Sequence, residues 1–313
     1  MMFAQSDGRQ EPLPCSSSIA RCTVSCISVF LTQLALCAVP LFFTASPLLF
    51  QLPLSALLLL LVLGFGGWFR RLLGIHASAP AFVFFSIIFT WGVYIFIIRK
   101  AISRFMDIAF NAEVVILIIG LFRIMSKDPG FVVHQSSCSS NEVDDISVVG
   151  FEDQNEHRVR YCKSCRAYVK GFDHHCPAFG NCIGQSNHAL FMVLLLGFLT
   201  TEASYIVCAS QFTRQPLVLE GIQLEANPSA ILAKSTMIFS VLQVLWQGLF
   251  LAWHVYCVCF NIRTDEWVNW KKYPEFQMSA SSQSGENHVR MRFINPYDKG
   301  IVDNVKEFLT LNV

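Results

Sequence analysis

The sequence predicts an all-α polytopic membrane protein, with about six transmembrane helices and one small cysteine-rich domain outside the bilayer. Three observations support this fold class. Hydrophobic residues make up 53% of the chain and charged residues only 14%, whereas soluble domains carry roughly 25% charged residues. Long apolar runs recur along the chain, and one polar segment is dense in cysteine and histidine. The net charge of +1 argues against a nucleic-acid partner.

The first apolar stretch is long enough for two spans. No acidic or basic residue occurs between Arg21 and Arg70, and one span needs about 20 apolar residues. Pro47, Gln51 and Pro53 mark the expected turn between the two helices. A signal peptide would need a much shorter apolar core and a small-residue cleavage site, so the length of this stretch argues against one.

Four further apolar runs are close to the length that a transmembrane helix needs. They cover residues 79–98, 108–125, 189–209 and about 233–260. We therefore expect four spans within residues 22–125 and two within residues 189–260. The polar residues between these two groups are expected to lie outside the bilayer.

An even number of spans before the polar segment determines which parts of the chain share a side. The N-terminal segment (residues 1–21), the polar segment and the C-terminal tail (residues 261–313) then lie together. Basic residues concentrate on the cytosolic side of membrane proteins, and this side carries Arg70, Arg71, Arg123, Lys127, Arg263, Lys271 and Lys272. We therefore expect the polar segment to face the cytosol.

Three basic residues disagree with this orientation. Arg99, Lys100 and Arg104 would lie on the opposite side of the membrane, where the same rule expects few positive charges. The sequence also contains nothing that distinguishes the Golgi, the endoplasmic reticulum and the plasma membrane. An integral multi-pass protein is therefore expected, in a membrane that the sequence does not specify.

The polar segment has two parts. Residues 126–157 contain an acidic stretch rich in Ser, Asp, Glu and Asn, which is typical of a flexible linker. Residues 158–188 are dense in Cys, His and Gly and predict a small compact domain. The chain has 12 cysteines, but disulfide scaffolds are characteristically short secreted chains. The cysteine pattern therefore fits reduced thiols that face the cytosol.

Four cysteines and two histidines crowd one short part of this domain, and the first two cysteines form a Cys-x-x-Cys pair. They are Cys162, Cys165, His174, His175, Cys176 and Cys182. Thiolates and imidazoles at such spacing are typical ligands of tetrahedral zinc. A small polar domain also benefits from a metal, because it cannot bury enough apolar surface to order itself. The pattern predicts a structural zinc site.

These six side chains exceed the four ligands of a structural zinc site. In an extended segment, His174 and Cys176 share one face while His175 points to the other. If His175 binds the metal, a histidine and a cysteine remain together, which is the arrangement of an activated thiolate nucleophile. Asp173 is placed to orient His174 and stabilise its charged form. The spacing alone leaves open which histidine binds the metal.

The run Asp173-His174-His175-Cys176 resembles the DHHC motif of protein S-acyltransferases, which are also called palmitoyltransferases. The surrounding positions of that family are matched by Cys162, Cys165, Pro177, Asn181, Cys182, Gly184, Asn187 and Phe191. Outside the domain, similar segments are Asp128-Pro129-Gly130, Thr264-Asp265-Glu266, and Asn295-Pro296-Tyr297 through Asn304. Arg263 stands where the family's TTxE motif has its first Thr. The resemblance covers residues 123 to 309 approximately.

The resemblance implies a role for each site residue. Cys176 is the nucleophile that becomes acylated, His174 is its base, and Asp173 orients His174. The zinc ligands are Cys162, Cys165, His175 and Cys182. The implied reaction moves a long-chain acyl (palmitoyl) group from acyl-CoA, the co-substrate, through an acyl-cysteine intermediate to target cysteines. The implied partners are cytosolic or membrane proteins with accessible cysteines.

Two departures from the family pattern concern metal binding and acyl-CoA contact. Typical members hold two structural zincs, but Tyr161 and Tyr168 occupy ligand positions of the first site, so we expect one zinc. The family's usual Trp after the motif proline is Ala178 here, which predicts looser contact with acyl-CoA. Basic groups such as Arg263 or Lys271 are expected near CoA. The alternative function is a catalytically weak, DHHC-like membrane scaffold that binds clients.

Overall fold

A computed structural model of the chain describes residues 15–132, 158–214, 227–280 and 290–311. Most of the expected N-terminal segment and acidic linker lies outside these residues. The chain divides into two compact units. One contains Met1–Ile102 and Cys208–Phe239, and the other contains Ser103–Val207 and Ser240–Val313.

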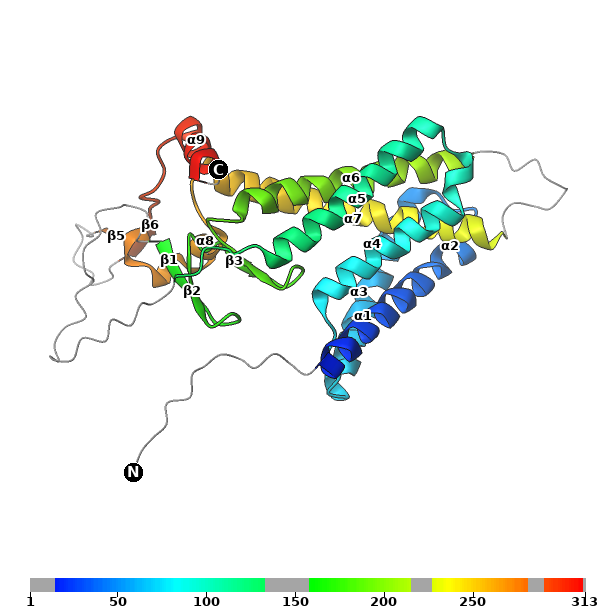
Figure 1. The fold of residues 1–313 in the computed structure, drawn as a ribbon, viewed down its shortest axis with the longest axis horizontal. Coiled ribbons are helices and arrows are strands. Elements are labelled where there is room, and N and C mark those ends of the chain that lie inside the picture. The colour runs from blue at the N-terminus through cyan, green and yellow to red at the C-terminus, as the bar shows by residue number, and fades with distance from the viewer. Residues whose placement is uncertain (1–14, 133–157, 215–226, 281–289, 312–313) are drawn as a thin grey trace, which may run out of the picture. The chain divides into compact units, whose positions relative to one another are not determined.

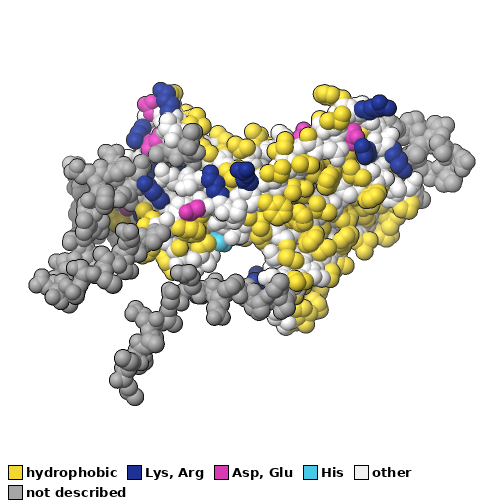
Figure 2. All heavy atoms as spheres, viewed as in Figure 1, with side chains coloured by type: hydrophobic (Ala, Val, Ile, Leu, Met, Phe, Trp, Pro, Cys, Tyr) yellow, Lys and Arg dark blue, Asp and Glu magenta, His cyan; other side chains and the backbone are white. Residues whose placement is uncertain are grey.

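Among the residues that the structure describes, six helical segments are long and apolar enough to cross a membrane: Ser18–Phe42, Leu48–Leu72, Ala79–Phe96, Arg104–Ser126, His188–Arg214 and Pro228–Cys259. Large apolar side chains such as Leu60, Ile116 and Leu249 are exposed on them, and hydrophobic side chains gather over the helices in view (Figure 2). Exposed apolar surface of this extent suits a lipid solvent. The predicted all-α membrane fold with six spans is confirmed, and the chain is an integral multi-pass membrane protein.

The first unit is built from α1 (Cys15–Leu36), α2 (Ala38–Phe42), α3 (Leu48–Leu72), α4 (Ala79–Phe96) and the short helix η1 (Ile98–Ala101). Helix α1 packs along α3 and α4 (Figure 1). The hydroxyl of Ser25 on α1 lies 2.8 Å from the carbonyl oxygen of Ser78 and accepts a hydrogen bond from its amide at 2.9 Å. Because backbone groups in an apolar environment need partners, this contact fixes the start of α4 on α1.

A side chain from the first turns of α3 stabilises the turn between the first two spans. Pro47, Gln51 and Pro53 were the predicted markers of this turn, but α3 already begins at Leu48, so Gln51 and Pro53 are helical. The buried amide of Gln51 donates to the carbonyl oxygens of Phe43 and Ser46, at 2.7 and 2.9 Å. The carbonyl oxygen of Phe43 also accepts from the backbone amide of Ser46 at 3.1 Å, so Gln51 adds hydrogen bonds to the backbone oxygens that follow α2.

The second unit contains α5 (Arg104–Ser126), α8 (Thr264–Asn269), α9 (Ile301–Leu311), and parts of α6 (His188–Arg214) and α7 (Pro228–Cys259). Its described residues also form three antiparallel strand pairs. Two are hairpins, β1 (Val159–Cys162) with β2 (Ala167–Lys170) and β3 (His174–Cys176) with β4 (Asn181–Ile183), and the third pairs β5 (Gln277–Ala280) with β6 (Arg290–Phe293). The side-chain amide of Asn181 donates to the backbone carbonyl oxygens of Ile124 and Lys127. These two hydrogen bonds attach β4 to the end of α5.

Side chains of the C-terminal tail form hydrogen bonds with the backbone at the end of α7. The side-chain amides of Asn304 and Asn295 donate to the carbonyl oxygens of Cys259 and Phe260, at 2.8 and 2.6 Å. These carbonyls lie in the last turn, where a helix leaves its oxygens without intrahelical partners. Phe276 is fully buried beside Cys257 and packs against the aromatic residues of the tail. The tail is therefore part of the packed second unit.

Candidate active site

Strand alternation separates the neighbouring residues of the DHHC run. In the β3–β4 hairpin, His175 pairs with Cys182, while His174 and Cys176 pair with Ile183 and Asn181. Successive side chains of a strand point to opposite faces, and directly paired residues share a face. His175 and Cys182 therefore lie on one face, and His174 and Cys176 lie on the other.

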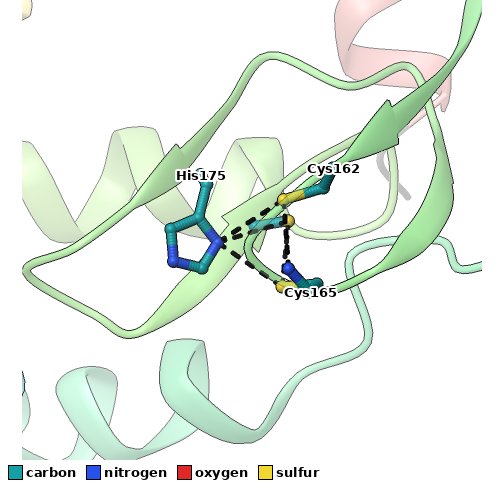
Figure 3. A group of neighbouring side chains, drawn as sticks. Cys162, Cys165 and His175 are labelled. Atoms are coloured by element: carbon teal, nitrogen blue, oxygen red, sulfur yellow. Dashed lines mark hydrogen bonds between the residues drawn. The ribbon is translucent and has the colours of Figure 1, made fainter. Parts of the chain in front are cut away.

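The first face carries a cluster of three thiols and one imidazole. Nδ1 of His175 lies 3.8, 3.4 and 3.6 Å from the sulfurs of Cys162, Cys165 and Cys182. The four ligand atoms all lie within 4.8 Å of one another. Figure 3 shows the ring of His175 facing the sulfurs of Cys162 and Cys165. Cys162 ends β1 and Cys165 follows in the turn, so one hairpin supplies two ligands and the other supplies the remaining two.

These separations match a tetrahedral zinc site. Zn–S bonds of about 2.3 Å and Zn–N bonds of about 2.0 Å at tetrahedral angles require N···S separations of roughly 3.6 Å. The three N···S distances average close to that value. The Sγ atoms of Cys165 and Cys182 are 3.4 Å apart. The donor set and its spacing therefore fit zinc, and Cys162, Cys165, His175 and Cys182 are the residues that could hold it.

Electrostatics also favour a cation in this cluster. Burial raises the pKa of the Cys182 thiol, and its contacts with Cys162 and Cys165 raise it further. Burial likewise raises the pKa of Cys165, with an added contribution from the charge of Cys162. Burial and the nearby His174 lower the pKa of His175, which keeps this ring neutral and able to offer a lone pair. Three neighbouring thiolates therefore need a metal to offset their repulsion.

Tyr161 and Tyr168 face each other across the β1–β2 hairpin. The two residues pair directly across the hairpin. Their rings pack edge to face, with ring centroids 5.2 Å apart. In the part of the chain that the structure describes, Cys162, Cys165, His175 and Cys182 form the one metal-compatible group that contains cysteine. An aromatic contact thus occupies the positions where the resemblance implied ligands of a first zinc.

The second face carries a buried acid–base pair. Nδ1 of His174 and Oδ2 of Asp173 are 2.7 Å apart. The carboxylate is fully buried, and its other oxygen accepts a hydrogen bond from the amide of Thr264 at 2.9 Å. Burial alone would raise the pKa of Asp173, but the hydrogen bond with His174 and the nearby histidines hold it well below its usual range. Asp173 is therefore an ionised carboxylate.

His174 is a stronger base than an ordinary histidine. Burial lowers its pKa, but the hydrogen bond with Asp173 and the neighbouring Cys176 outweigh this effect and raise the pKa to about 9. Its second nitrogen, Nε2, has no hydrogen-bond partner among the described residues. Cys176 itself is buried. This face therefore combines a thiol with a histidine that binds protons tightly.

Residues distant in sequence hold the pair in place. Besides the Thr264 contact, the amide of Asp265 donates to the backbone oxygen of Asp173 at 2.9 Å. Helix α8 is fixed in turn by Glu266, whose buried carboxylate receives two hydrogen bonds from Arg158 and one from the amide of Arg263. Sequence reasoning identified the Thr264–Glu266 segment only as a motif. It missed Arg158, because nothing local signals a partner more than 100 residues away.

The expected contact of Arg263 with CoA is not supported. Arg263 is buried, with 8% of the residue's surface exposed, and it donates to Nδ1 of His188. Lys271 is exposed and lies over the ring of Trp270. Of the two basic groups, only Lys271 is accessible to a soluble phosphate.

Taken with the six membrane helices found among the described residues, the two faces of this hairpin define a class of protein: a membrane protein with a thiol and an Asp–His pair beside a zinc-type cluster. Comparison with known proteins finds a family match for part of the chain. Residues 152–271 match the family described as DHHC palmitoyltransferase. This segment is therefore similar to the DHHC palmitoyltransferase family, and the resemblance predicted from the sequence is confirmed.

Three curated relatives are each named as a palmitoyltransferase. Palmitoyltransferase ZDHHC18 of Mus musculus is 31% identical over 156 residues, which are 47% of this chain and 36% of that protein. Palmitoyltransferase ZDHHC17 of Homo sapiens is 23% identical over 225 residues, 65% of this chain and 34% of that protein. Palmitoyltransferase Hip14 of Drosophila melanogaster is 25% identical over 239 residues, 70% and 35% respectively. The matches thus span about a third of the length of these relatives.

Proposed function

We propose that this chain is a protein S-acyltransferase, which moves a long-chain acyl (palmitoyl) group from acyl-CoA to cysteine thiols of target proteins. The observation that carries the proposal is the separation of roles on the β3–β4 hairpin. His175 faces the metal-type cluster, while Asp173, His174 and Cys176 form a nucleophile with its base and orienting carboxylate. This is the arrangement that covalent catalysis by cysteine requires.

The reaction has two thioester exchanges. In the first, His174 takes the proton of Cys176, and the resulting thiolate attacks the thioester carbonyl of acyl-CoA. The bond from the acyl carbon to the CoA sulfur breaks, and CoA leaves with the proton from His174.

In the second thioester exchange, His174 takes the proton of a target cysteine, whose thiolate attacks the acyl-Cys176 carbonyl. Cys176 leaves and is reprotonated. The raised pKa of His174 favours the thiolate in each step.

One structural zinc completes the domain in this proposal. Cys162, Cys165, His175 and Cys182 would hold it, and it would supply a fixed link between the β1–β2 and β3–β4 hairpins. Cys176 and His174 lie on the other face. The zinc therefore orders the loop that carries the nucleophile and leaves the thiol chemistry to the protein.

The site faces the cytosol in this proposal, since acyl-CoA and reduced thiols are found there. The partners are then cytosolic or membrane proteins with accessible cysteines. The support is the even number of candidate spans before the domain, together with the basic residues that flank the spans on the same side.

The test is formation of an acyl-enzyme. Purified protein is incubated with a labelled long-chain acyl-CoA, wild type beside Cys176→Ser, and zinc is measured in both. We expect a hydroxylamine-sensitive label on the wild type alone. Absence of label on folded, zinc-loaded wild type would contradict the enzyme and leave the client-binding scaffold, which the replacement of the usual Trp by Ala178 favours.

A further inference from the structure

The fully buried Asp173 carboxylate has two hydrogen-bond partners among the described residues and room for another donor. Oδ1 accepts from the amide of Thr264, and Oδ2 pairs with His174. A carboxylate has room for about four donors, and buried ones with depressed pKa values accept two or three. Asp173 is fully buried, so water does not supply the remainder at its surface. A further donor beside Oδ2 would complete the set.

His254 on α7 lies at that position. Its Nδ1 is 3.9 Å from Oδ2 of Asp173. The side chain is fully buried, and neither ring nitrogen has a hydrogen-bond partner among the described residues. A buried polar group without a partner requires an explanation, because the hydrogen bonds to water that it loses on burial are not replaced. The geometry thus brings an unsatisfied donor beside a carboxylate oxygen that can accept another hydrogen bond.

The surroundings of His254 leave few other roles. Its ring packs edge to face on Phe250 and Phe191, with centroids 4.5 and 4.9 Å away. The polar groups near it are Asp173, His174 at 5.7 Å and His188 at 6.2 Å between ring centroids. Among these, only the carboxylate is an obligate acceptor. A neutral imidazole with its proton on Nδ1 is the form that this pocket accommodates.

We propose that His254 is a positioning residue for the Asp173–His174 pair, donating from Nδ1 to Oδ2 of Asp173. The inference rests on the proposed function. With the Thr264 amide on one oxygen and His254 on the other, the carboxylate cannot rotate away from His174. His174 then keeps Nδ1 on Asp173 and Nε2 free for the thiol proton. Hydrogen bonds of this kind are often long without substrate and tighten in the substrate complex.

Two substitutions separate hydrogen bonding from packing. His254→Asn keeps a side-chain N–H donor near the position of Nδ1, whereas His254→Phe keeps the ring and removes the donor. Phe250→Leu removes a ring from the same wall and leaves the carboxylate untouched. The readout is the rate at which iodoacetamide alkylates Cys176, followed by mass spectrometry of its peptide. Acyl-enzyme formation, zinc content and thermal unfolding are measured on the same samples.

We expect His254→Phe to slow both alkylation of Cys176 and acyl-enzyme formation by about tenfold or more, the usual effect of removing a group that orients a functional side chain. His254→Asn and Phe250→Leu should stay within about threefold of wild type, with unchanged zinc. Equal losses in His254→Asn and His254→Phe, an equal loss in Phe250→Leu, or a wild-type rate in His254→Phe would overturn the inference. A zinc content one ion lower in His254→Phe would overturn it as well, since it would make Asp173, His174 and His254 a metal site.

Alkylation needs no acyl transfer, so the outcome for His254 is independent of the outcome for the proposed function. If wild type forms no acyl-enzyme but His254→Phe alone slows alkylation, the function fails and the positioning role stands. If wild type is acylated and His254→Phe reacts at the wild-type rate with both reagents, the function stands and the positioning role fails.

Discussion

At the scale of single residues, one step along β3 changes the chemistry of a side chain. His174 and His175 are adjacent, but the strand turns them to opposite faces. His174 meets a buried carboxylate, and its pKa rises to about 9. His175 meets three thiols, and its pKa is lowered. The surroundings of each ring, which the strand selects, determine whether it suits proton transfer or metal binding.

Metal content should therefore distinguish the two faces. We expect wild type and Cys176→Ser to bind one zinc per chain, because Cys176 lies away from the cluster. Cys182→Ser should lose the zinc and unfold at lower temperature, since structural zinc contributes directly to folding. Elemental analysis and thermal melting in detergent give both values. Two zincs in the wild type, or a retained zinc in Cys182→Ser, would be evidence against the proposed ligand set.

Gly184 is a second test at this scale. A Cβ at this position would lie 2.4 Å from the carbonyl oxygen of Pro129 and 2.6 Å from Cγ1 of Val169. Gly184→Ala should destabilise the domain by about 1–3 kcal/mol, because backbone atoms cannot move aside cheaply. Gly248→Ala on α7 is the control, since its Cβ would meet nothing within 4 Å. Similar melting temperatures for both variants would show that the approach to Pro129 is not tight.

The sequence predicted the separation of His174 and His175 onto opposite faces, because this feature depends on a short-range rule. The alternation of His174, His175 and Cys176 follows from the strand period of two. The roles of His254, Thr264 and Arg158 could not be predicted in the same way, because each acts on a group that the fold brings from a distant part of the chain. His254 carried one weak signal, a lone histidine inside an apolar run.

At the scale of elements, the β3–β4 hairpin is held by a series of contacts through α8. Arg158, next to β1, forms a buried ion pair with Glu266 on α8 and also contacts Asn261 and the ring of Tyr297. The amides of Thr264 and Asp265 on the same helix hold Asp173. The cysteine-rich domain and the C-terminal tail therefore depend on each other for their positions.

Arg158→Ala should be strongly destabilising. It leaves the carboxylate of Glu266 buried and unpaired, and breaking a buried pair from one side costs about 3–5 kcal/mol. Lys306→Ala is the control, because the Lys306–Asp303 pair is solvent-exposed and such pairs contribute at most about 1 kcal/mol. Thermal melting compares the two. An Arg158→Ala melting temperature as high as that of Lys306→Ala would show that the ion pair does not hold α8.

Helix boundaries were predicted less accurately than helix positions. The predicted fourth span began at residue 108, but α5 begins at Arg104, where the hydroxyl of Ser103 caps the amide of Met106. The predicted turn at Pro47, Gln51 and Pro53 lies partly within α3. In both places a polar side chain satisfies backbone groups at a helix end, which hydropathy does not report.

At the scale of the whole molecule, the six candidate spans found among the described residues predict the membrane topology of the chain. An even number of crossings places both ends of the chain on one side. Epitope tags at the two termini should both be accessible in cells whose plasma membrane alone is permeabilised, and a tag inserted among residues 215–226 should be protected. The reason is that these residues connect α6 and α7, which would be the fifth and sixth spans. Termini on opposite sides would mean that one of the six helices does not cross.

The edge-to-face contact of Tyr161 and Tyr168 has a consequence for metal supply. A domain with two zinc sites competes for two ions each time a chain is made, and it stays immature until both are captured. In this protein the β1–β2 hairpin is held by the contact of two tyrosine rings, which needs no metal ion. With the single cluster proposed, each chain draws one ion from the cell, so maturation of this protein should fail later than that of two-zinc proteins when zinc becomes scarce.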